Sequence, residues 1–339
     1  MTGTAPAAGM VRPMAAITHA QVEAAGAGSL EVRWDMDNDT DVDIFLGKTP
    51  SPDEHRHARH VPAGTRWARV DGLEPGHRRY LSIRPVGPAA PVVVAERRLP
   101  FEGSRNFRDL GGYQTSFGTR TRWGRLFRSG ALHHLTTADR EAFGRLGVQV
   151  VFDLRGRAER DLEPDPMESV PLALLDWYSS SSALSVLKAT TAEEAERICY
   201  EMYTGMLAQV ASLFGQLLSD LGRPGRLPAL FHCAGGKDRT GMAAALLLGL
   251  LGVDRRTILD DFELSTGALS PRDQLFAQAL VAAGAAPAAA AAFLTAPRWA
   301  MSDALDGLDD QYGGTEAYLL GPAGMNEATV AALRRALCA

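Results

Sequence analysis

Cysteine is scarce in this 339-residue chain, which contains only Cys199, Cys233 and Cys338. Three such scattered thiols cannot form the disulfide framework of a small secreted domain, so we expect reduced cysteines and a cytoplasmic protein. Excess positive charge is also lacking, because 35 basic side chains face 40 acidic ones. The resulting net charge of -5 argues against a nucleic-acid-binding protein, since phosphate backbones are bound chiefly by clustered cations.

Long hydrophobic runs are missing as well. The run at 242–253 is too short to cross a bilayer, and Pro287 interrupts the one around 285–294. The N-terminal residues lack the continuous apolar core of a signal peptide, so we expect no integral membrane association. Hydrophobic residues nevertheless make up 46% of the chain, which is enough to bury a core without disulfides, and the length suggests two domains.

The hydrophobic pattern divides the chain into three parts. Residues 1–14 are small and aperiodic, which predicts a disordered tail. Residues 15–99 show a period of two, with Leu30, Val32 and Trp34 separated by charged side chains, and clusters of proline and glycine mark the turns. This pattern predicts a small all-β sandwich domain.

From residue 100 to 339 the period changes, and short apolar runs alternate with helical patterns. The runs at Val148–Asp153, Leu172–Leu175 and Leu227–His232 are typical of buried parallel strands. Helices are predicted at Thr137–Leu146, Ala192–Leu221, Arg239–Leu251 and Glu327–Leu337, the first capped by Thr136 or Thr137 and the last by Asn326. Alternating strands and helices predict an α/β domain in which helices flank a mostly parallel central sheet.

One segment carries most of the chemistry: Leu230-Phe231-His232-Cys233-Ala234-Gly235-Gly236-Lys237-Asp238-Arg239-Thr240-Gly241. It leads from a predicted strand into a predicted helix, so its loop lies at a helix N-terminus, where free N–H groups bind anions. The glycine pair lets successive N–H groups turn inward, and Arg239 can hold two phosphate oxygens with its planar fork. The same positive field favours the thiolate form of a cysteine, which is the nucleophilic form. A lone cysteine in a strand is usually an inert hydrophobe, but the combination favours a catalytic Cys233.

This segment matches the Cys-x5-Arg signature of the cysteine-dependent protein tyrosine phosphatases. With Gly-Lys-Asp-Arg-Thr-Gly it resembles the bacterial atypical group, also called triple-specificity or lipid-phosphatase-like phosphatases. Further stretches similar to that family are Asn106–Gly112, Gly124–Ser129, Asp153–Arg155, Tyr312–Gly314 and Tyr318-Leu319. The resemblance implies the phosphatase α/β sandwich, a cysteinyl-phosphate intermediate, a phosphate-binding loop at 234–239, and neither a metal nor another cofactor.

The N-terminal domain resembles fibronectin type III domains at Gly72–Tyr80, although Tyr80 lies one residue later after the proline than in the usual pattern. A likeness of fold does not define function. We therefore expect this domain to be a scaffold or a surface that docks a partner.

Phosphate-ester cleavage also needs a carboxyl group that protonates the leaving oxygen and then activates water, and three aspartates are candidates for parts of this role. Asp176 follows an apolar run, as the acid does in the resembled family, and is the first choice; it could instead cap a turn. Asp153 also ends a strand but is better interpreted as a hydrogen-bonding anchor. Asp238 lies within the loop, where it could activate water, orient Arg239, or only stabilise the helix dipole.

Several other residues have weaker assignments. In the resembled family a lysine at the position of Lys237 accompanies highly charged substrates such as phosphoinositides, although a solvated lysine is the alternative. Thr240 could donate to the sulfur of Cys233 or cap the helix. Arg108 and Arg155 are interpreted as structural, and Cys199 as inert unless it approaches Cys233.

The histidines suggest no metal site. His55, His57 and His60 fall in a proline-bounded polar stretch that we interpret as a solvated loop, and His133-His134 are expected at the surface. The region 179–194 is a short polar insertion where the family often has a helical lid, which predicts an open pocket.

The sequence thus predicts a phosphomonoesterase whose leading substrate is a phosphotyrosine protein. A phosphoinositide or a small phosphorylated metabolite is the alternative substrate. A non-catalytic phosphate-binding module is an alternative of another class, disfavoured by the intact Cys233 and Arg239. A rhodanese-type sulfur transferase is a further alternative, disfavoured because such loops lack the Gly-Lys-Asp-Arg-Thr sequence that ends this one.

Overall fold

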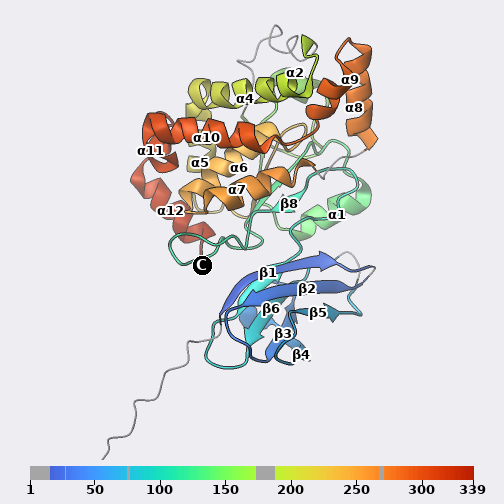
Figure 1. Ribbon diagram of the computed structural model, residues 1–339, viewed down its shortest axis with the longest axis vertical. Coiled ribbons are helices and arrows are strands. Elements are labelled where there is room, and N and C mark those ends of the chain that lie inside the picture. The colour runs from blue at the N-terminus through green and yellow to red at the C-terminus, as the bar shows by residue number, and fades with distance from the viewer. Residues whose placement is uncertain (1–15, 27, 75–76, 173–187, 267–270) are drawn as a thin grey trace, which may run out of the picture. The chain divides into compact units, whose positions relative to one another are not determined.

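The computed structural model describes residues 16–26, 28–74, 77–172, 188–266 and 271–339 (Figure 1). The predicted tail at 1–14 and the candidate acid Asp176 lie outside these residues. The chain divides into two compact units, 1–97 and 98–339, close to the boundary expected between residues 99 and 100. Among the described helices, none is both long and apolar enough to cross a membrane.

The N-terminal unit is built from antiparallel strands in two sheets. One sheet has the order β1-β2-β5, and the other β4-β3-β6-β7. The strands are β1 (Ile17–Ala24), β2 (Leu30–Met36), β3 (Val42–Gly47), β4 (Arg56–Val61), β5 (Trp67–Val70), β6 (Tyr80–Pro85) and β7 (Val92–Ala95), and one 3-10 turn lies at Pro52–Glu54. Its hydrophobic core joins side chains from both sheets, including Val32, Trp34, Ile44 and Ile83.

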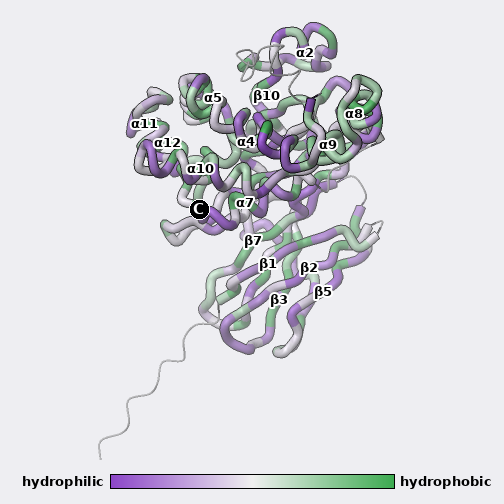
Figure 2. Tube along the Cα trace, turned by 45° about the horizontal axis from the view of Figure 1, so that its top comes forward, coloured by the Kyte–Doolittle hydropathy of each residue, from purple (hydrophilic) through white to green (hydrophobic). Residues whose placement is uncertain are grey.

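The alternation in the sequence has the predicted consequence in β2. Leu30, Val32 and Trp34 are buried, whereas the residues between them are at least partly exposed. Figure 2 shows hydrophobic and hydrophilic residues alternating along the strands of this unit. The predicted solvated loop around His57 and His60 is wrong, because Arg56–Val61 forms β4. Five of its six side chains are exposed, so the strand carries no hydrophobic alternation from which it could be predicted.

The C-terminal unit contains a five-stranded sheet of order β11-β10-β12-β9-β8. β11, β10, β12 and β9 are parallel, and β8 pairs antiparallel with β9 at the edge. The strands are β8 (Arg108–Asp109), β9 (Leu126–Ser129), β10 (Val150–Asp153), β11 (Val170–Pro171) and β12 (Ala229–His232). The mostly parallel sheet is therefore confirmed, with β12 in its centre. Most of the strand predicted at Leu172–Leu175 lies outside the described residues.

Helices flank this sheet. They are α1 (Thr137–Arg145), α2 (Arg157–Leu162), α4 (Ala192–Gln209), α5 (Ala211–Leu221), α6 (Asp238–Leu250), α7 (Arg255–Glu263), α8 (Pro271–Ala282), α9 (Pro287–Ala292), α10 (Arg298–Tyr312), α11 (Thr315–Leu320) and α12 (Glu327–Leu337). Thr136 and Asn326 cap α1 and α12 as predicted. The single helix expected over Ala192–Leu221 is instead two, because the backbone leaves the helical conformation at Val210.

Both faces of the sheet are buried, which explains why its strands are nearly continuous apolar runs. Phe152 and Phe231 pack into the large core formed with α4, α5 and α6, and α10 lies alongside α4 (Figure 1). Val151 and Leu230 point the other way, into a smaller core beside α1. The central strand β12 is thus held from both sides, and its C-terminal end has a fixed position.

Candidate active site

Cys233 lies at the carboxyl end of the central strand β12, and α6 begins five residues later. Its side chain is buried at 2% exposure. The first N–H groups of any helix lack partners within the helix, and the N-cap residue Lys237 provides no side-chain cap for them. The loop 233–237 therefore combines a cysteine with the anion-binding end of a helix.

Gly236 is required by its position in this loop. Its φ of +64° lies in the left-handed region, which side chains disfavour. A Cβ atom there would also come within 2.5 Å of backbone atoms of Ser129 and Gly130. The loop can therefore fold closely against the end of β9 only with glycine at this position.

The outer side of the loop is fixed by the Asn106–Gly112 motif and by β9. The carbonyl oxygen of Gly236 accepts hydrogen bonds from Asn106 Nδ2 at 2.7 Å and from Arg128 Nη2 at 2.9 Å. Asn106 has a φ of +59°, a conformation that asparagine tolerates better than most residues. The shape of the loop thus depends on polar contacts with residues far away in the sequence.

A buried carboxylate on α7 holds the two arginines of this support. Asp261 accepts from Arg108 Nε at 3.0 Å and from Arg128 Nη1 at 2.6 Å, and all three side chains are at most 1% exposed. Burial lowers the pKa of Arg128 to about 10, and the Asp261 carboxylate opposes that shift. Arg108 is therefore structural, and its contact with Asp261 stabilises the base of the loop.

The variant Asp261→Asn should lower the free energy of unfolding by about 3–5 kcal/mol, because it leaves two buried guanidinium groups without a counter-charge. The neighbouring variant Asp260→Asn is the control. Asp260 pairs with Arg298 at an exposed position, so its loss should cost about 1 kcal/mol or less. Urea unfolding of both variants measures the difference, and equal costs would remove Asp261 from this role.

Arg239, in the first turn of α6, is positioned by a residue that the sequence did not indicate. Glu159 on α2 binds its guanidinium in a two-pronged contact, with Nη1 to Oε2 at 2.5 Å and Nη2 to Oε1 at 2.9 Å. Burial acts against the charged form of Arg239, but Cys233 and Glu159 outweigh it and raise its pKa. The pair therefore keeps a fixed cation next to the cysteine.

The variant Glu159→Gln should lower kcat/KM about tenfold, because it weakens the charge-assisted hydrogen bonds that orient Arg239. Asp161→Asn on the same helix is a matched control, since Asp161 is exposed and pairs only at 3.5 Å with Arg157. Steady-state hydrolysis by the two variants tests this expectation. Equal kinetics in both would show that Arg239 needs no such support.

A buried cluster of titratable side chains includes His232, the residue before the cysteine. His232 Nε2 is 2.9 Å from Asp165 Oδ2, and Arg155 Nη2 is 2.7 Å from Asp153 and 2.9 Å from Asp165. Burial raises the pKa of Asp165, but His232 and Arg155 outweigh it and hold that pKa low. Both carboxylate oxygens of Asp153 accept hydrogen bonds from Arg155. Asp153 is therefore engaged in a structural contact.

The remaining loop residues have partners on α4 and after α9. Tyr203 donates its hydroxyl to Asp238 Oδ1 at 2.7 Å, and burial together with Asp238 raises the pKa of Tyr203. Lys237 Nζ donates to the carbonyl oxygens of Phe293 at 2.5 Å and Thr295 at 2.7 Å. Its ammonium therefore joins the loop to the segment after α9.

Thr240 does not cap α6, because the helix has no side-chain cap. Its buried hydroxyl makes no hydrogen bond with any residue that the structure describes. The role as a helix cap is therefore wrong, and donation to the sulfur of Cys233 stays a prediction.

Arg105 supplies a second cation that the sequence did not indicate. Its Nη2 is 3.5 Å from the carbonyl oxygen of Ala234. It also lies close to Gly235, since a Cβ atom added to that glycine would be 3.1 Å from Nη2. Burial lowers the pKa of Arg105, while Cys233 and Asp238 oppose the shift. The only sequence signal was its place just before the Asn106–Gly112 motif.

The other cysteines and the N-terminal histidines have ordinary structural settings. Burial raises the pKa of Cys199 to about 12, which fits an inert thiol, and all three cysteines are free. His55 is buried between Thr49 and Ser82, and His57 and His60 contact Asp43. Among the described residues, these three do not form a group with metal-binding geometry.

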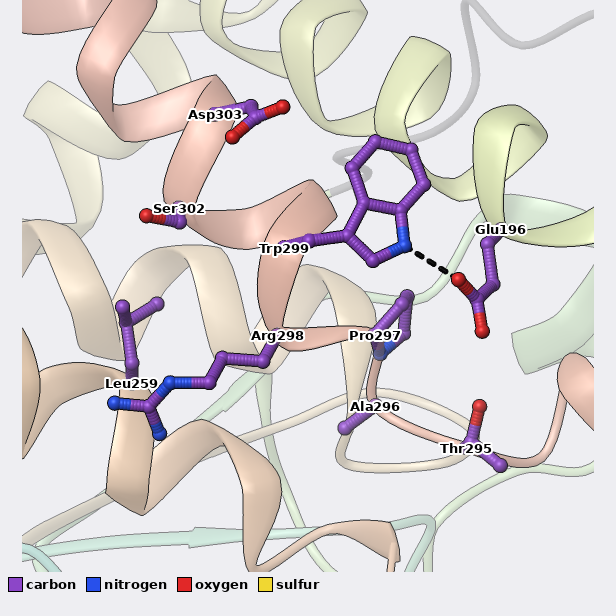
Figure 3. Close-up of a pocket in the computed structure, with 9 residues that line it drawn as sticks. All are labelled: Glu196, Leu259, Thr295, Ala296, Pro297, Arg298, Trp299, Ser302 and Asp303. Atoms are coloured by element: carbon purple, nitrogen blue, oxygen red, sulfur yellow. Dashed lines mark hydrogen bonds between the residues drawn. The ribbon is translucent and has the colours of Figure 1, made fainter. Parts of the chain in front are cut away.

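A hollow of about 650 Å³ adjoins the segment that Lys237 holds (Figure 3). It is lined by Glu196, Leu259, Thr295, Ala296, Pro297, Arg298, Trp299, Ser302 and Asp303. The Trp299 indole N–H donates to the Glu196 carboxylate, as the dashed line shows, and its ring stacks near Tyr200. Thr295 is shared between this hollow and the contact with Lys237, so the hollow lies close to the loop.

Comparison with known proteins agrees with this geometry. Residues 99–339 match the family described as "Tyrosine phosphatase family". A Cupriavidus necator protein named "Putative tyrosine-protein phosphatase" is 30% identical over 263 residues, covering 75% of this chain and 93% of its own. The triple specificity protein phosphatase PtpB of Mycobacterium tuberculosis is 30% identical over 293 residues, covering 72% and 99%.

A third relative matches a shorter stretch. The tyrosine-protein phosphatase of Nostoc commune is 30% identical over 154 residues, covering 43% of this chain and half of its own. The family match takes in the whole C-terminal unit apart from its first residue, including Cys233, Arg239 and their supports. The chain belongs to the tyrosine phosphatase family, and it is a phosphatase.

Proposed function

We propose that this phosphatase cleaves phosphomonoesters through a cysteinyl-phosphate intermediate, with phosphotyrosine in proteins as its leading substrate. The observation that carries the proposal is the placement of Cys233 beside the uncapped N-terminus of α6 and the Arg239–Glu159 pair. A tetrahedral phosphoryl group bound there would receive hydrogen bonds from the loop 234–239 and from Arg239.

In the first step, the Cys233 sulfur attacks phosphorus, and the bond from phosphorus to the leaving oxygen breaks. A carboxylic acid gives its proton to that oxygen. In the second step, a carboxylate accepts a proton from water, the water oxygen attacks phosphorus, and the thiolate leaves. The Thr240 hydroxyl is free to donate to the departing sulfur.

We propose Asp176 as the acid, with Asp238 as the alternative. Asp238 lies within the loop at the start of α6, and Tyr203 donates to its carboxylate. Asp153 takes a supporting role, because Arg155 occupies both of its oxygens.

The variant Asp176→Asn should lower kcat at least about 100-fold on alkyl phosphates, because their leaving oxygens need a proton. On p-nitrophenyl phosphate, whose leaving group is a weaker base, the loss should be about tenfold or less. Asp238→Asn is measured on the same two substrates. If only Asp238→Asn shows the leaving-group dependence, the acid is Asp238, and equal losses on both substrates exclude Asp176.

Dual or lipid specificity is a finer proposal. The name of the M. tuberculosis relative, a triple specificity phosphatase, supports more than one kind of substrate, and the cations near the loop support a highly charged one. The Lys237 ammonium donates to two carbonyl groups, and Arg105 Nη2 is 3.5 Å from the carbonyl oxygen of Ala234. These two cations are the candidates for recognition of a second anionic group. Phosphate binding by Lys237 remains a prediction from the sequence resemblance.

The N-terminal unit has no chemistry of its own in this proposal. Residues 15–99 form a fibronectin type III-like domain that docks a partner or acts as a scaffold. A cytoplasmic location, suggested by the free cysteines, belongs to the same proposal.

The test is phosphate release with EDTA present. The substrates are phosphotyrosine, phosphoserine and phosphothreonine peptides, phosphoinositides, and a set of sugar and nucleoside phosphates. The proposal expects phosphotyrosine peptides to be turned over fastest. Faster turnover of a sugar or nucleoside phosphate would replace it with a metabolic role, and no turnover on any substrate would contradict it.

A further inference from the structure

Two adjacent histidines and a glutamate converge beside the phosphate loop. His133 and His134 lie between β9 and α1, and Glu163 is the C-cap residue of α2. One possible ligand atom from each residue lies within 4.8 Å of the others. The catalytic steps described above use none of the three.

The spacing is close to that required by a metal ion. His133 Nε2 is 3.2 Å from Glu163 Oε2, and two ligands of one tetrahedral zinc ion lie about 3.3 Å apart. The His133 side chain is only 12% exposed, so its position is fixed, whereas the Glu163 side chain is 50% exposed and can adjust. His134 is exposed, and its ring centroid is 3.8 Å from that of His133.

The chemistry of the three side chains favours zinc over magnesium or calcium. Two imidazoles and one carboxylate are a ligand set that Zn²⁺ binds with a water molecule in the fourth position. Mg²⁺ and Ca²⁺ prefer oxygen ligands. The second group with similar spacing, Asp153, Asp165 and His232, is unsuitable because the Arg155 guanidinium already pairs with both carboxylates.

The two segments that carry these residues, the loop after β9 and the end of α2, both contact residues of the active site. Ala131, on the same loop as His133, donates its N–H to the carbonyl oxygen of Ala234 at 3.1 Å. The carbonyl oxygen of Glu163 accepts from Arg155. The Glu163 N–H donates to the backbone carbonyl oxygen of Glu159, whose carboxylate holds Arg239. An ion bound here would join the two segments that flank the phosphate loop.

We propose that His133, His134 and Glu163 bind one Zn²⁺ ion, which ties the 130–136 loop to the end of α2. The ion is not part of the hydrolytic reaction. Its effect is to stabilise the C-terminal unit and to restrain the helix that carries Glu159. Binding can therefore be tested without any assay of turnover.

The experiment titrates Co²⁺ and then Zn²⁺ into the full-length Cys233→Ser protein, so that the active-site thiol cannot bind the metal. We expect one ion per chain and visible bands of four-coordinate Co²⁺ without thiolate charge transfer. At a free Zn²⁺ concentration about a hundred times Kd, the Tm of the protein should rise by about 5 °C. His134→Ala and Glu163→Gln, both at exposed side chains, should each weaken binding at least about tenfold.

The control is a protein with His57→Ala and His60→Ala, which removes exposed imidazoles beside Asp43 in the N-terminal unit. Its metal binding should equal that of the parent. Binding that persists in His134→Ala and Glu163→Gln, or that disappears in the control, would overturn the proposal. Thiolate charge transfer, indicating a site at Cys199 or Cys338, would overturn it as well.

Discussion

Replacing Cys233 by serine is expected to lower kcat by about 10⁴-fold or more. Serine has nearly the same shape, but its hydroxyl is not ionised at neutral pH, so the nucleophile is lost while the loop 234–239 remains. The measurement is phosphate release from a phosphotyrosine peptide. Binding of vanadate, a phosphate analogue, should persist in the variant because the helix N-terminus and Arg239 are retained.

Cys199→Ser is the matched control for this substitution. Cys199 is also buried, and burial raises its pKa to about 12, so its thiol has no nucleophilic role in the proposal. We expect kcat to change less than about twofold in this control. A Cys233→Ser protein that kept a tenth or more of the wild-type kcat would exclude Cys233 as the nucleophile.

The variant Arg239→Lys should lower kcat/KM by about 10²–10³-fold. Lysine retains the charge, but it loses the planar fork that can bind phosphoryl oxygens on one edge while Glu159 holds the other. Steady-state kinetics on a phosphotyrosine peptide provide the measurement. Arg256→Lys on α7 is the control, because Arg256 is exposed and reaches Asp260 only at 4.0 Å.

A loss of less than tenfold in Arg239→Lys would mean that a point charge is sufficient. Transition-state binding would then come mainly from the N–H groups of the loop 234–239. Comparison with Glu159→Gln separates the two contributions, since that variant disturbs the orientation of Arg239 without changing its charge.

The core of the site could be predicted because it is local in the sequence. Strand, cysteine, glycines, arginine and helix follow one another within 230–241, and each has a physical role at a strand-to-helix junction. The strand β12 and the caps of α1 and α12 followed from a hydrophobic run and from capping residues in the same way.

The supporting residues could not be predicted because tertiary folding brings them together. Glu159 lies 80 residues from Arg239, and Asp261 lies 153 residues from Arg108. No local pattern distinguishes Glu159 from the other acidic residues near it, such as Asp161 and Glu163. The pairing of Lys237 with carbonyl groups after α9 is equally invisible in sequence, since it depends on where that segment folds.

Two errors in secondary structure have the same origin. β4 has an almost fully exposed pattern, so nothing in its composition indicated a strand, and pairing with β3 forms it. The break between α4 and α5 at Val210 has neither proline nor glycine to mark it. Tertiary packing outweighs local preference in both cases.

The most direct test of the account is to locate the phosphoryl group during turnover. The enzyme is mixed rapidly with p-nitrophenyl phosphate, quenched in acid within the first turnover, digested and analysed by mass spectrometry. We expect a transient phosphoryl group on the peptide that contains Cys233, formed as p-nitrophenol is released and lost as phosphate appears. Turnover without a phosphoenzyme, or a phosphoryl group on another residue, would contradict it.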